Sequence, residues 1–128
     1  MSSRRWTFAL CAVTLLIWTT RIGNIWNDAD LSDGEKWGRT ALAASFTVLA
    51  LLAAYAVHRR TAWRDLAVRA LAGWTVVVWA VRAVGIATGD HEAAFIVVHL
   101  VLATVSVALA ALAVRSERPV PASARRDR

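Results

Sequence analysis

The chain has 128 residues and 58% of them are hydrophobic, a larger share than soluble domains usually contain. Its formal net charge is +6, but the basic residues gather in the predicted loops and at the termini, which argues against a nucleic-acid-binding surface. A single cysteine excludes an internal disulfide and a thiol-rich metal site.

Four long stretches of the chain contain no Asp, Glu, Lys or Arg. A membrane-spanning helix needs about 20 apolar residues, a length that the second and fourth stretches reach. The first and third stretches reach it only if their helices continue through Arg21 and Arg82. We therefore expect four transmembrane helices, near residues 6–26, 38–58, 68–88 and 93–114.

The first and third stretches share one pattern, in which threonine, tryptophan and arginine follow one another at spacings of four and three residues. These residues are Thr14, Trp18 and Arg21 in the first stretch and Thr75, Trp79 and Arg82 in the third. The spacings place each set on one face of a helix, where the indole can contact the guanidinium group one turn later. The loops that follow also match, because Asp33 and Glu35 after the first stretch correspond to Asp90 and Glu92 after the third. The pattern favours an all-α bundle of two tandem helical hairpins related by internal duplication, with chance similarity as the alternative.

Most basic residues lie on one side of this four-helix arrangement, and most acidic residues lie on the other, together with Lys36 and Arg39. The basic side carries Arg4, Arg5, Arg59, Arg60, Arg64, Arg69 and the arginines after residue 114, and the acidic side carries Asp28, Asp30, Asp33, Glu35, Asp90 and Glu92. Because short loops rich in Lys and Arg remain in the cytoplasm, we expect a multi-pass protein of the plasma membrane with both termini inside. The predominance of arginine over lysine, with abundant alanine and valine, suggests a bacterial source.

The bundle is expected to occupy residues 1–114, and the segment 115–128 is expected to be a disordered basic tail. This segment contains two prolines and many charges, a composition that does not support a packed core. Basic residues next to a membrane helix attract anionic lipid, so we expect the tail to contact the bilayer and not nucleic acid. So small a bundle is also compatible with a homo-oligomer or with a partner protein in the membrane.

Five polar residues are expected to meet in the outer half of the bundle, namely Arg21, Asn24, Arg82, Glu92 and His99. Glu92 and His99 share a helical face because they are seven residues apart, and His99 lies at about the depth of Arg82. Ionisable side chains within membrane spans are candidates for function, and guanidinium groups can grip a phosphate or carboxylate by bidentate hydrogen bonds. The pattern predicts an outward-facing pocket for a small anion or a lipid headgroup, with Trp18 and Trp79 supporting the arginines.

A structural interpretation of the same residues stays open. Each arginine could extend toward the outer surface and pair with a loop acid, namely Asp28, Asp33, Asp90 or Glu92. His99 could form an ordinary hydrogen bond between helices. Glu35 and Arg39 are four residues apart and are expected to form an exposed ion pair worth a few tenths of a kcal/mol.

The sequence lacks the spacing of a metal site, a Gly-rich phosphate loop and a nucleophile elbow, so no cofactor, metal ligand or catalytic residue is assigned. The first functional hypothesis is a non-catalytic accessory or interaction protein of the membrane. The alternative is a protein that binds or transports an anionic molecule at Arg21 and Arg82. A more distant third is a membrane-embedded enzyme that uses Glu92 and His99 as an acid–base pair.

Overall fold

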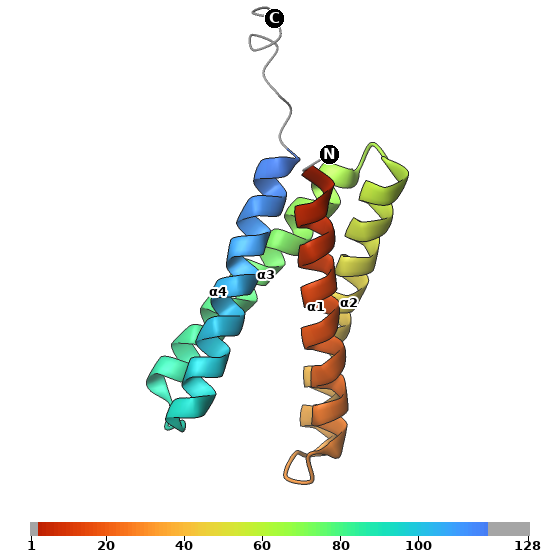
Figure 1. Ribbon diagram of the computed structural model, residues 1–128. Coiled ribbons are helices and arrows are strands. Elements are labelled where there is room, and N and C mark those ends of the chain that lie inside the picture. The colour runs from red at the N-terminus through yellow and green to blue at the C-terminus, as the bar shows by residue number, and fades with distance from the viewer. Residues whose placement is uncertain (1–2, 118–128) are drawn as a thin grey trace, which may run out of the picture.

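The computed structural model describes residues 3–117, which form four α-helices and no strand (Figure 1). The helices are α1 (Ser3–Asn27), α2 (Asp33–Arg59), α3 (Arg64–Thr88) and α4 (Ala93–Ser116). Each is long and apolar enough to cross a membrane, because a rise of about 1.5 Å per residue gives every helix more than the ~30 Å of a bilayer core. The expected all-α bundle of four transmembrane helices is confirmed.

The helices extend beyond the apolar stretches that predict them. α2 begins at Asp33, where Ser32 and Glu35 form a capping box: each side chain hydrogen-bonds the backbone N–H of the other residue. α4 continues through Arg115 and Ser116, so these two residues of the expected tail are helical. The rest of that tail, from residue 118 onward, lies outside the described residues.

The two ends of the bundle differ in charge. The α1–α2 and α3–α4 loops lie at the same end of the bundle, which we call the acidic end because its loops contain Asp28, Asp30, Asp90 and Glu92. The start of α1, the α2–α3 connection and the end of α4 lie at the other end (Figure 1), which we call the basic end because it carries Arg4, Arg5, Arg59, Arg60 and Arg115.

The two hairpins meet at the basic end and separate toward the acidic end (Figure 1). At the basic end, the Glu117 carboxylate accepts a hydrogen bond from Thr7 Oγ1 at 3.3 Å and pairs with Arg64 Nε at 3.7 Å. Only 8% of the Glu117 side chain is exposed, which strengthens both contacts by limiting solvent screening. This carboxylate therefore joins α1, α3 and the end of α4.

An aromatic stack fixes the middle of the bundle. The fully buried Phe46 ring of α2 lies parallel to the Trp18 indole of α1, with centroids 4.1 Å apart and an angle of 5° between the planes. Trp74 of α3 lies 6.0 Å from Phe46, and its Nε1 donates a 2.9 Å hydrogen bond to Ser45 Oγ. Trp18 is thus packed against α2, and through Phe46 and Trp74 the stack also reaches α3.

Candidate functional site

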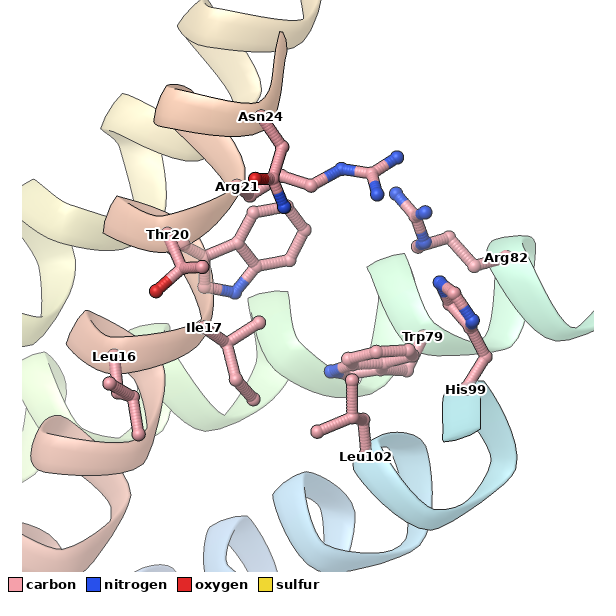
Figure 2. A pocket seen from close by; sticks show the side chains of 10 residues that line it. Leu16, Ile17, Thr20, Arg21, Asn24, Trp79, Arg82, His99 and Leu102 are labelled. Atoms are coloured by element: carbon pink, nitrogen blue, oxygen red, sulfur yellow. The ribbon is translucent and has the colours of Figure 1, made fainter. Parts of the chain in front are cut away.

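A cavity of about 350 Å³ lies between α1, α3 and α4, in the half of the bundle nearer the acidic end. The buried indoles of Trp18 and Trp79 close it on the inside. It is lined by apolar and polar side chains together, namely Leu16, Ile17, Trp18, Thr20, Arg21, Asn24, Trp79, Arg82, His99 and Leu102 (Figure 2).

Four of the five residues expected to form a pocket line this cavity: Arg21, Asn24, Arg82 and His99. Glu92 does not, because it is the exposed N-cap residue of α4 and precedes His99 by seven residues. At a rise of about 1.5 Å per residue, that spacing is roughly 10 Å along the helix. The structure therefore does not bring Glu92 and His99 together as an acid–base pair.

The guanidinium groups of Arg21 and Arg82 point toward each other across the cavity (Figure 2). Both side chains are half-buried. Within residues 3–117 the ion pairs are Arg64–Glu117 and Arg69–Asp65, so neither arginine of the cavity has a carboxylate partner. The expected alternative, in which they pair with acids of the loops, does not occur among the described residues. Two like charges thus face each other in a largely apolar setting.

Arg39 of α2 belongs to the same charged cluster, which sequence reasoning missed. A second cavity of about 240 Å³ adjoins the first and is lined by Trp18, Arg21, Ile25, Arg39, Leu42 and Arg82. The expected Glu35–Arg39 ion pair does not form, and Glu35 Oε2 instead accepts hydrogen bonds from the backbone N–H and the hydroxyl of Ser32. The Ser-x-x-Glu capping sequence was the signal that could have revealed this competition.

The two arginines differ in their aromatic neighbours, although their local sequences match. The Arg82 guanidinium carbon lies 6.0 Å from the centroid of the Trp79 ring, within the range of a cation–π contact. Trp18 instead stacks on Phe46, and the described residues contain no corresponding contact between Trp18 and Arg21. Arg21 is therefore the less well compensated of the two charges.

His99 presents a ring of fixed orientation to the cavity. Its Nδ1 lies 2.8 Å from the Phe95 carbonyl oxygen, and since a carbonyl can only accept, Nδ1 carries the hydrogen. The ring also packs on Phe95, with centroids 3.9 Å apart. These contacts leave Nε2 available to a ligand, as an acceptor in the neutral ring and as a donor in the protonated ring.

The side chains that line the cavity are better suited to binding an anion than to binding a metal ion. Within the part of the chain that the structure describes, no three His, Cys, Asp or Glu residues lie close enough to hold a metal ion. Its polar groups are guanidinium, imidazole, amide and hydroxyl, a set rich in hydrogen-bond donors and without a carboxylate. Such a set matches phosphate or carboxylate oxygens.

Comparison of the chain with known protein families, with curated proteins and with solved structures finds no match. A function must therefore be inferred from the chemistry of the site itself.

Proposed function

We propose that this is a non-catalytic membrane protein that binds an anionic small molecule or lipid headgroup between Arg21 and Arg82. The observation that carries the proposal is the facing pair of guanidinium groups without a carboxylate partner in residues 3–117. An arginine costs about 2.5–3.5 kcal/mol at the centre of a membrane helix and less toward its ends. An anion between the two groups would remove their repulsion and accept charge-assisted hydrogen bonds.

The other two hypotheses have less support. In an accessory protein whose arginines are purely structural, carboxylates would be expected to pair with Arg21 and Arg82. Within residues 3–117, the acids of the loops do not form ion pairs with either arginine. A membrane enzyme based on Glu92 and His99 would need the two groups within hydrogen-bonding reach or one water apart, whereas about two helical turns separate them.

The cavity would open toward the outside of the cell. The supporting observation is the concentration of arginine at the basic end, which favours cytoplasmic termini in a bacterial plasma membrane. The repeated threonine, tryptophan and arginine pattern supports an origin of the two hairpins by duplication.

Single cysteines test this orientation. In a Cys11→Ala background, a membrane-impermeant maleimide applied to intact cells is expected to label Asp30→Cys and Asp90→Cys in the loops of the acidic end. Ala62→Cys, in the α2–α3 connection, is expected to react only after lysis. Labelling of Ala62→Cys in intact cells would place the cavity on the cytoplasmic side.

Anion binding is tested by replacing the facing arginines. Purified protein in neutral detergent is titrated with inorganic phosphate and with phosphatidylglycerol, and dissociation constants are measured for wild type, Arg21→Gln, Arg82→Gln and the double variant. A charge-assisted hydrogen bond contributes about 1.5–3 kcal/mol, so each single change is expected to weaken binding about tenfold or more. The double variant is expected to lose about 100-fold or more.

The matched control is Arg59→Gln with Arg60→Gln, which removes the same charge from exposed positions at the basic end. Its affinity should remain that of the wild type. Equal weakening by the control pair would show non-specific attraction between charges and contradict the proposal. The proposal would also be contradicted if neither phosphate nor phosphatidylglycerol bound to the wild type.

A further inference from the structure

The cavity has a polar half and an apolar half. Arg21, Asn24 and His99 line it toward the acidic end, whereas Leu16 and Leu102 line it nearer the middle of the bundle. A free inorganic anion would use only the polar half. A ligand with an anionic head and a hydrocarbon chain would use both.

The cavity also opens through the side of the bundle. Leu16 lines it and is nevertheless 69% exposed, and Thr20 and Asn24 on the same face of α1 are exposed as well. The opposite wall is closed, since only 4% of Trp18 and of Trp79 is exposed. The opening therefore lies between α1 and α4, the helices that diverge in Figure 1 toward the acidic end.

The depth of this opening places it among lipid chains. Leu16 precedes the end of α1 by eleven residues, or about 17 Å at 1.5 Å per residue, close to the midplane of a bilayer core about 30 Å thick. Arg21 precedes the same end by six residues, or about 9 Å, on the headgroup side of Leu16. The polar half thus lies toward the headgroups and the apolar half beside the acyl chains.

We propose that the ligand is an anionic phospholipid of the leaflet at the acidic end, with its phosphate between Arg21 and Arg82 and one acyl chain leaving past Leu16 and Leu102. This inference rests on the proposed function and specifies its ligand. Arg39 in the adjoining cavity adds a third cation, and among residues 3–117 no carboxylate lines either cavity to receive the ammonium group of a zwitterionic lipid. The site therefore selects an anionic headgroup over phosphatidylcholine.

The test compares lipids that differ only in the headgroup. Native mass spectrometry measures binding of phosphatidylglycerol and of phosphatidylcholine with identical chains, while titration of the same samples measures binding of inorganic phosphate. Wild type is expected to prefer phosphatidylglycerol about tenfold or more, and the Arg21→Gln/Arg82→Gln variant is expected to lose this preference.

Two further variants block the lateral opening. Leu16→Trp and Leu102→Trp enlarge side chains on α1 and α4 at its two edges, and each is expected to weaken phosphatidylglycerol binding about tenfold. Thermal unfolding of both variants in detergent, followed by circular dichroism, shows whether they fold as wild type does. Leu100→Trp is the control, because it adds the same ring to α4 at an exposed position outside the cavity lining.

The outcomes separate the two proposals. Arginine-dependent phosphate binding without a preference for phosphatidylglycerol would overturn the lipid inference and leave the proposed function standing. Unchanged phosphatidylglycerol binding in both Leu16→Trp and Leu102→Trp would likewise overturn only the lipid inference. If neither free phosphate nor phosphatidylglycerol binds in an arginine-dependent way, both proposals fail.

Discussion

Replacement of Phe46 by alanine is expected to lower the free energy of unfolding by about 3–5 kcal/mol. Phe46 is fully buried and contacts the indoles of Trp18 and Trp74, so its removal leaves a void shared by α1, α2 and α3. Because packing contacts are a main source of helix association within a bilayer, neighbouring lipid does not replace what is lost. Thermal unfolding in detergent, followed by tryptophan fluorescence and circular dichroism, measures the effect.

The same change should also weaken ligand binding. Trp18 closes the inside of the cavity and is positioned by its stack on Phe46, so a looser indole should lower the affinity for phosphatidylglycerol. Phe8→Ala is the matched control, because Phe8 is 38% exposed and is not among the residues that line the cavity. Equal destabilisation by the two alanine variants would show that the stack does not organise the bundle.

Arg82→Gln is expected to stabilise the ligand-free protein, by about 1 kcal/mol or a few degrees in melting temperature. The substitution removes a half-buried charge that faces Arg21 without a carboxylate partner among the described residues. The contact with Trp79 offsets only part of the cost of that charge. If Arg82 had a purely structural role, its replacement would instead lower the stability, because the loss of its charge would leave a buried partner unpaired.

Added ligand should reverse this order of stability. At a phosphatidylglycerol concentration of about 100 times the wild-type dissociation constant, wild type should gain about 2.7 kcal/mol, whereas Arg82→Gln, which binds about tenfold more weakly, should gain only about 1.4 kcal/mol. Arg69→Gln is the control, since Arg69 is exposed and pairs with Asp65 at 2.9 Å; its loss should cost a few tenths of a kcal/mol. A ligand-free Arg82→Gln protein that melts well below wild type would contradict the proposed role of this residue.

The arrangement of the bundle suits a site that is entered from the side. Glu117 joins the helices at the basic end through Thr7 and Arg64, and the Phe46 stack joins them at the middle. Toward the acidic end the hairpins separate (Figure 1). A lipid bound as we propose would therefore enter between α1 and α4 without disrupting these contacts.

The sequence alone determined the four helices and the approximate depths of Arg21, Arg82 and His99. Both depend on local properties: uninterrupted hydropathy gives the spans, and a fixed rise per residue gives the depth of each side chain within its helix. The common face of Thr14, Trp18 and Arg21 is equally a matter of spacing.

Only the tertiary structure decided which of these groups meet. Glu92 lies outside the cavity because the helix begins after it, and Arg39 is free to join the cluster because Ser32 occupies the Glu35 carboxylate. Trp18 and Trp79 have matching local sequences but different partners, since Trp18 stacks on Phe46 and Trp79 contacts Arg82. The capping box of Ser32 and Glu35 is local, but the partners of Trp18 and Trp79 depend on neighbours from separate helices and on the angle between the hairpins, which no single helix encodes.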